Sequence, residues 1–146
     1  MNEKLLELSN YRMTKAKDDL EGSSLLFNNG KLAQSANRSY YAMFHATRAL
    51  LALDKFDSKK HTGIIAYFNK NYIKTGKIEI EYGKMLMSAE RVRTKSDYDD
   101  FYVIDKETAQ TQLENAEKFI IAIESYISDF NSESQWVLNP VSIKYF

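Results

Sequence analysis

The chain has 146 residues, of which 44% are apolar and 27% are charged, so it is long enough to bury the core of one globular domain. The absence of cysteine excludes disulfides and thiolate chemistry, and no apolar run approaches the roughly 18 residues that span a bilayer. The 20 basic residues balance the 20 acidic ones, which excludes a strongly basic protein that coats nucleic acid non-specifically.

Five helices are predicted, because a single proline and 5 glycines leave long stretches without turn residues. Apolar residues recur at helical spacing in these stretches, and no run alternates as a strand would. The first helix ends at an Asn-Asn-Gly turn, and Asp105 resembles the N-terminal cap of the fifth. The predicted helices span residues 9–28, 31–54, 60–72, 80–95 and 105–130.

The predicted fold class is all-α, an up-and-down bundle of four to five helices in one domain that covers residues 1–130. Residues 131–146 lose the helical period, which predicts an irregular C-terminal tail. Trp136 and Phe146 are among its apolar side chains, so we expect this tail to dock on the bundle. The N-terminal residues do not resemble a signal peptide, and we expect a cytoplasmic location without membrane contact.

The predicted second helix has two faces. Its core face is a stripe of mainly apolar residues, namely Ala33, Ala36, Tyr40, Met43, Phe44, Thr47 and Leu51. On the opposite side, spacings of three and four residues place a polar row on one narrow stripe, consisting of Gln34, Arg38, Tyr41, His45 and Arg48. This row is where the sequence suggests more than packing.

Arg38 and His45 are separated by almost two helical turns, about 10 Å along the axis, so both side chains can reach one phosphate. Arginine is a permanent cation with a planar fork that suits phosphate oxygens, and histidine exchanges a proton near neutrality. The pair suits metal-independent RNA cleavage, in which the ribose 2′-hydroxyl attacks the adjacent phosphate. A solvated helix face, or a polar seam between two copies, explains the same row without catalysis.

Three stretches of the sequence occur in an order that is typical of one protein family. Arg38, six intervening residues and His45 form an R-x4-6-H signature within N-R-S-Y-Y-A-M-F-H-A-T-R-A-L-L. The second stretch is S-K-K-H-T-G at residues 58–63, followed by Y-I-K-T-G, and the third is R-T-K-S-D-Y at residues 93–98. Over about residues 9–130 the chain resembles the HEPN family (higher eukaryotes and prokaryotes nucleotide-binding), in its small stand-alone prokaryotic branch.

The resemblance implies a helical bundle that forms a homodimer through its second helix, with two Arg–His pairs facing a shared cleft. It implies a metal-independent ribonuclease acting on RNA, often a toxin paired with a nucleotidyltransferase antitoxin. The alternative is a non-catalytic module that binds a nucleotide or docks such a partner, and a purely structural dimer is a third possibility. Thr47 stands where better-studied toxins of the family often carry a tyrosine that the partner enzyme modifies.

The other polar residues have less certain chemistry. Gln34, Tyr41 and Arg48 are substrate-binding candidates, with dimer packing as the alternative for Tyr41. For Arg48 the alternative is a salt bridge to Asp97 or to the aspartates at 99 and 100. Asp97 and Tyr98 are expected either to orient the residues of the second helix, or to cap and pack the end of the fourth.

His61 lies beside Lys59 and Lys60 at the start of the predicted third helix. The favoured interpretation is that this basic cluster caps or solvates a helix start, and the alternative is that it helps to bind phosphate. With 2 histidines and no cysteine the sequence predicts no metal site, and it contains no glycine-rich loop that would cradle a nucleotide phosphate. We therefore expect no cofactor.

Overall fold

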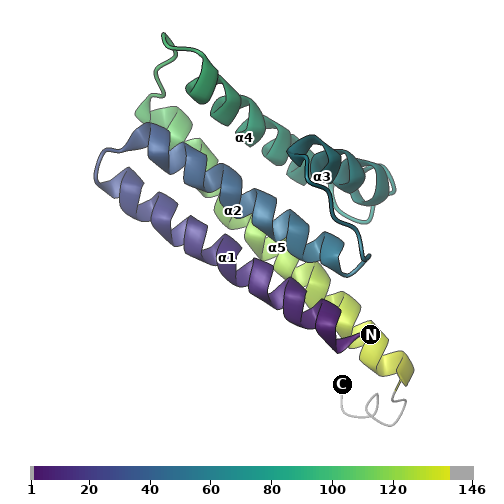
Figure 1. Cartoon of the computed structure of the whole chain (residues 1–146). Coiled ribbons are helices and arrows are strands. Elements are labelled where there is room, and N and C mark those ends of the chain that lie inside the picture. Colours follow the sequence, from purple (N-terminus) through teal and green to yellow (C-terminus); the bar gives the residue numbers. More distant parts are fainter. Residues whose placement is uncertain (1, 139–146) are drawn as a thin grey trace.

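The computed structural model describes the backbone of residues 2–138 and the side chains of residues 2–131. Within these residues the chain is all-helical, which confirms the predicted fold class. Figure 1 shows α1 and α2 side by side, with α3 and α4 on the other side of α2 and α5 packed behind. The elements are α1 (Glu3–Asn28), α2 (Leu32–Ala52), α3 (His61–Phe68), the π-helical turn η1 (Asn69–Ile73), α4 (Ile80–Tyr98) and α5 (Lys106–Leu138).

The structure corrects the predicted helix ends. α1 begins at Glu3, because the Asn2 side chain accepts a hydrogen bond from the Lys4 backbone N–H at 2.8 Å and caps the helix. The predicted third helix is divided between α3 and η1. α5 continues to Leu138, so residues 131–138 are helical where the start of an irregular tail was predicted. The predicted docking of the tail lies outside the described residues.

The turn after α1 fixes how α1 and α2 lie against each other. Gly30 adopts a φ of 75°, its N–H donates to the Phe27 carbonyl at 3.0 Å, and the Lys31 N–H donates to the Leu26 carbonyl at 2.9 Å. This pair of bonds is a Schellman motif, which needs a residue without a side chain at the left-handed position. The chain therefore reverses sharply and brings α2 back antiparallel to α1.

Three buried serines hold α1 and α2 close together. The Ser23 hydroxyl donates to the Ser35 carbonyl at 2.8 Å, and the Ser35 hydroxyl returns a bond to the Ser23 carbonyl at 2.9 Å. Ser39 completes the cluster, with its hydroxyl oxygen 2.7 Å from that of Ser23. Because small side chains allow close approach and every hydroxyl is bonded, the cluster sets the register of the hairpin.

α2 is the central helix of the bundle and packs against α1, α3, α4 and α5. From Ser35 to Ala52 it is buried almost all round, so the core face is wider than predicted, although Ala33 is exposed and does not belong to it. The largest fully buried side chains include Tyr40, Met43 and Leu50 of α2, Phe68 of α3, Leu86 of α4, and Phe119 and Ile123 of α5. Among the described residues no helix is long and apolar enough to cross a membrane.

Candidate functional site: the polar row of α2

The polar row of α2, consisting of Arg38, Tyr41, His45 and Arg48, is the strip of this helix that remains partly open. The four side chains are half-buried, whereas most of the residues between them are buried. The predicted alignment of these residues on one stripe is therefore confirmed. Gln34, the fifth predicted member, is exposed one turn before Arg38 and makes no hydrogen bond or ion pair within the described residues.

Asp19 of α1 joins the two residues of the R-x6-H signature. Its Oδ1 accepts a bond from Nη1 of Arg38 at 3.0 Å, and its Oδ2 lies 3.7 Å from Nε2 of His45. The Asp19 side chain is only 16% exposed, so this carboxylate acts in a partly desolvated environment where charges interact more strongly. One carboxylate thus bonds the arginine and lies beside the histidine.

The surroundings of His45 favour its neutral form. Burial lowers the pKa of its imidazole, and Lys15, Arg48 and Arg38 lower it further, against the opposing effect of Asp19. Its Nδ1 is buried and has no hydrogen-bond partner among the described residues. At neutral pH the ring is consequently uncharged, which is the form of an imidazole that can accept a proton.

Tyr41 connects the row to α3 and α4. The Arg38 guanidinium lies 4.9 Å from the centre of its ring, and the Arg93 guanidinium of α4 lies 5.6 Å from it. The centres of the His45 and His61 rings are 6.0 and 5.9 Å from that of Tyr41. The tyrosine is therefore packed between cations by cation–π contacts and between the two histidines of the chain.

Arg48 is paired, but not with the aspartates that the sequence suggested. Its Nη2 donates to both carboxylate oxygens of Asp57, at 3.2 and 3.0 Å. Asp57 lies in the loop between α2 and α3. Arg12 of α1, 8% exposed, donates to the same carboxylate at 3.2 Å and to the Arg48 carbonyl at 3.2 Å. The alternative of a salt bridge from Arg48 to Asp97, Asp99 or Asp100 is therefore wrong.

The pKa of the Asp57 carboxyl is lowered, because its bonds to the Ser58 N–H and to Arg48, with the charge of Arg12, outweigh the opposing effect of burial. Two guanidinium groups thus share one carboxylate that stays ionised at neutral pH.

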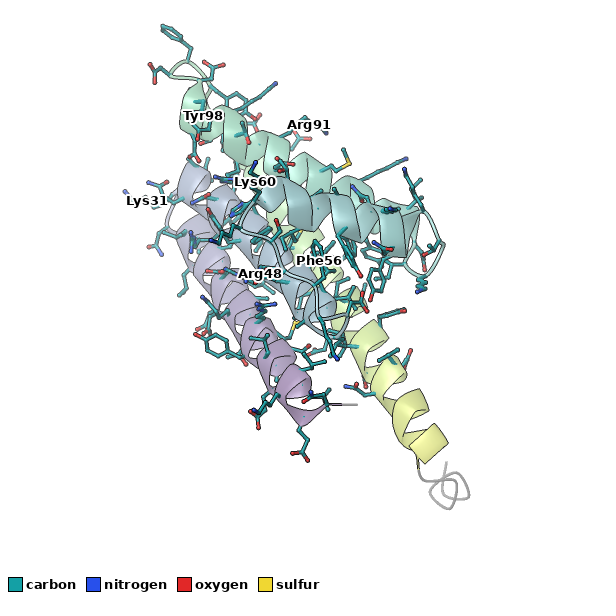
Figure 2. All side chains as sticks on the ribbon, turned by 45° about the vertical axis from the view of Figure 1, so that its right-hand side comes forward. Lys31, Arg48, Phe56, Lys60, Arg91 and Tyr98 are labelled. Carbon is teal, nitrogen blue, oxygen red and sulfur yellow. The ribbon has the colours of Figure 1, made fainter. Side chains whose placement is uncertain are left out.

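The two residues predicted at the end of α4 lie differently from each other. Asp97 is paired with Arg93 at 3.6 Å between Nε and Oδ2, and Arg93 in turn lies against the Tyr40 and Tyr41 rings. Tyr98 is 81% exposed at the end of α4, well away from Arg48 (Figure 2). The structure therefore connects Asp97 to the row through Arg93 and leaves Tyr98 outside it.

His61 belongs to the site, which the sequence did not favour. Its Nδ1 is 2.9 Å from the hydroxyl of Tyr40, and its ring stacks on Phe44 with centres 4.1 Å apart. Lys60 makes no side-chain cap bond, whereas Lys59 and Lys60 are exposed as a solvated helix start predicts, so His61 is the packed member of this cluster. Beside the ring lies a surface cavity of about 500 Å³, lined by Phe44, Arg48, Asp57, Ser58, Lys59 and His61.

Neither Asp19 nor Asp57 was found by sequence reasoning. A signal for Asp19 existed, because a sharp turn at Gly30 places residue 19 of an antiparallel hairpin opposite residue 38 or its neighbours. Asp57 lies in a loop, and no periodic pattern relates a loop residue to the helix that it contacts. Within the described residues no group of three or more histidine, aspartate or glutamate side chains is placed to hold a metal ion.

An all-helical bundle with an Arg–His pair on its second helix is what the HEPN resemblance implied, and the comparisons with known proteins agree. The model of the HEPN domain family matches residues 9–126, so the chain belongs to this family.

Several relatives match most of the chain. A UPF0332 protein of Thermotoga maritima is 35% identical over 129 residues, which cover 88% of this chain and 97% of the relative. The protein named "Putative toxin MJ0142" of Methanocaldococcus jannaschii is 32% identical, with 90% of this chain and 92% of the relative covered. "Putative toxin MJ0605" of the same organism is 31% identical, with coverage of 78% and 84%.

Proposed function

We propose that this protein is a metal-independent RNA endonuclease of the HEPN type, with Arg38 and His45 at its site. The observation that carries the proposal is the joint placement of a neutral, half-buried imidazole and a guanidinium on one Asp19 carboxylate, in the one strip of α2 that remains partly open. A purely structural surface does not require a histidine whose pKa is lowered by burial. Relatives named as toxins support a role as the toxin of a toxin–antitoxin pair.

In the proposed reaction His45 takes the proton of a ribose 2′-hydroxyl. The 2′-oxygen then bonds to the adjacent phosphorus, the bond from phosphorus to the 5′-oxygen breaks, and the proton is returned to that leaving oxygen. The products are a 2′,3′-cyclic phosphate and a 5′-hydroxyl. Arg38 stabilises the charge that develops on the phosphate, and Asp19 stabilises the imidazolium that forms while His45 holds the proton.

We further propose that two copies pair through α2, so that two Arg–His pairs face one cleft. The polar row is flanked by buried residues and its own cations are only partly exposed, which suits a surface that receives a second copy or a nucleic acid. Light scattering after gel filtration should give twice the chain mass of 16.9 kDa. A mass of one chain would remove the shared cleft from the proposal.

The proposed antitoxin is a nucleotidyltransferase. Thr47 is fully buried and its hydroxyl donates to the Met43 carbonyl at 2.9 Å, so a partner enzyme cannot modify this position in the folded protein. Control by such a partner therefore has to act through binding or through another residue.

The proposed reaction is tested by blocking the 2′-hydroxyl of the RNA, which is the attacking group. Purified protein with a metal chelator should cleave an RNA oligonucleotide and leave cyclic phosphate ends, but should leave a 2′-O-methyl oligonucleotide of the same sequence intact. Cleavage of both substrates, or cleavage that depends on added Mg²⁺, would contradict the mechanism.

The second candidate is a non-catalytic module that binds RNA, a nucleotide or a partner protein at the same row. It is favoured by one observation, namely that both arginines of the row are already paired with carboxylates in the free chain. Such a module would bind the 2′-O-methyl oligonucleotide and would cleave neither substrate.

A further inference from the structure

The cavity beside His61 is continuous with the polar row. Arg48 belongs to both, and it follows His45 by three residues, about 4.5 Å along the axis of α2. Phe44, the residue before His45, lines the cavity and stacks on the His61 ring. An RNA strand that has one phosphate at Arg38 and His45 and continues toward Arg48 would bring its neighbouring nucleotide to the mouth of this cavity.

The charge of the cavity favours an anion. Its lining contains two cations, Arg48 and Lys59, and one carboxylate, Asp57, which is shared with the buried Arg12 behind it. Three cations thus surround one carboxylate. Lys59 is exposed and makes no ion pair within the described residues, so its ammonium group is available to a ligand.

The His61 ring forms its hydrogen bond to Tyr40 through Nδ1, which leaves Nε2 without a partner among the described residues. Burial raises the pKa of the Tyr40 hydroxyl, which therefore stays protonated and forms a hydrogen bond with Nδ1 of His61 at 2.9 Å. In the tautomer that accepts this bond at Nδ1, the neutral imidazole carries its own proton on Nε2. Nε2 makes no hydrogen bond within the described residues and is not buried, so in this tautomer it offers a donor to a phosphate oxygen.

We infer that Lys59, His61 and Arg48 form a second phosphate subsite, which binds the nucleotide next to the linkage held by Arg38 and His45. The inference rests on the proposed function, because it takes the first phosphate to lie at the Arg–His pair. It implies that the substrate is a strand with at least two consecutive phosphates, and that a dinucleotide with a single phosphate binds more weakly.

Imidazole NMR tests this directly, because the chain contains only 2 histidines and each gives its own signal. The probe is a 2′-O-methyl trinucleotide, which has two phosphates and cannot be cleaved. It should shift both the His45 and the His61 signals. Lys59→Ala should weaken trinucleotide binding about two- to fivefold, as expected for one exposed charge pair, and should leave dinucleotide binding at His45 unchanged. Lys70→Ala, an exposed lysine of η1 outside the cavity lining, is the matched control.

The possible failures are distinct. A shift of His45 without a shift of His61 would show that the row binds RNA and that the cavity is not a subsite. No shift of either signal would overturn the RNA site of the proposed function together with the subsite. An equal shift of His61 by inorganic phosphate at the same concentration would make the cavity a general anion site and overturn the assignment to RNA.

Discussion

The Asp19 carboxylate lies 3.7 Å from Nε2 of His45, too far for a hydrogen bond but close enough to stabilise a protonated imidazole. The same carboxylate is bonded to Arg38 at 3.0 Å. Asp19 therefore connects the two residues of the signature, and its charge opposes the burial that lowers the pKa of His45. The basicity of the proposed catalytic histidine, which burial lowers, is consequently raised by a residue of a different helix.

Replacing Asp19 with asparagine should lower the pKa of His45 further. The substitution removes the one negative charge that favours the protonated ring, while burial and the surrounding cations remain. Lys15→Gln should have the opposite effect, because Lys15 lowers the pKa of His45. Histidine NMR titration measures both, and Asp18→Asn, an exposed neighbour, is the control. Shifts in the same direction for the two variants would refute this account of the electrostatics.

Cleavage should persist at mildly acidic pH and then fall. A base whose pKa is lowered from 6.5 stays neutral at and somewhat below that pH, and it loses activity only as the pH drops through its own, lower pKa. The acid limb of kcat/KM should move down in Asp19→Asn and up in Lys15→Gln, as the NMR values do. If neither substitution moves the acid limb of kcat/KM, this limb reports the titration of a group other than His45.

Arg12 is predicted to be structural. It is buried, it donates to Asp57 and to the Arg48 carbonyl, and its replacement by alanine leaves that carbonyl without its donor. Arg12→Ala should lower the free energy of unfolding by about 2–3 kcal/mol, as expected for hydrogen bonds from a charged group. Urea denaturation measures the change, and Arg91→Ala on the exposed side of α4 (Figure 2) should cost much less. Equal losses would show that the buried pairing contributes nothing.

The buried serine cluster should be sensitive to a single hydroxyl. Ser23 is fully buried and bonds both Ser35 and Ser39, so Ser23→Ala leaves partners unsatisfied between α1 and α2. We expect a loss of about 1–3 kcal/mol in the free energy of unfolding. Ser125→Ala, on the exposed side of α5, should change it by less than about 0.5 kcal/mol. If Ser23→Ala leaves the free energy of unfolding unchanged, packing alone holds α1 against α2.

The polar row was predictable because helical periodicity alone determines which residues of α2 share a stripe. Arg38, Tyr41, His45 and Arg48 lie where that spacing places them, and Thr47 is buried as expected. The width of the core face was not predictable, since Ala33 is exposed near the start of α2, whereas positions deeper in the helix are enclosed by four neighbouring elements.

The partners of the row were less predictable, because they depend on tertiary packing. Arg48 forms its ion pair with a loop aspartate, Asp57, and not with the aspartates near the end of α4. The basic neighbours of His61 in the sequence indicate a helix start that faces solvent, whereas the His61 ring packs against Phe44 and Tyr40 of α2. Pairings of this kind depend on how the helices cross. They can be predicted from the sequence only where a tight turn, such as the one at Gly30, fixes the register of two helices.

The central claim is tested most directly by RNA cleavage in EDTA with wild-type protein, Arg38→Ala and His45→Ala. The account predicts cleavage by the wild type and its loss in both variants, with folding retained because both side chains lie on the partly open strip of α2. Lys70→Ala, an exposed substitution outside the site, should cleave as the wild type does. Wild-type protein that binds RNA without cleaving it, or His45→Ala that cleaves normally, would contradict a nuclease built on this pair.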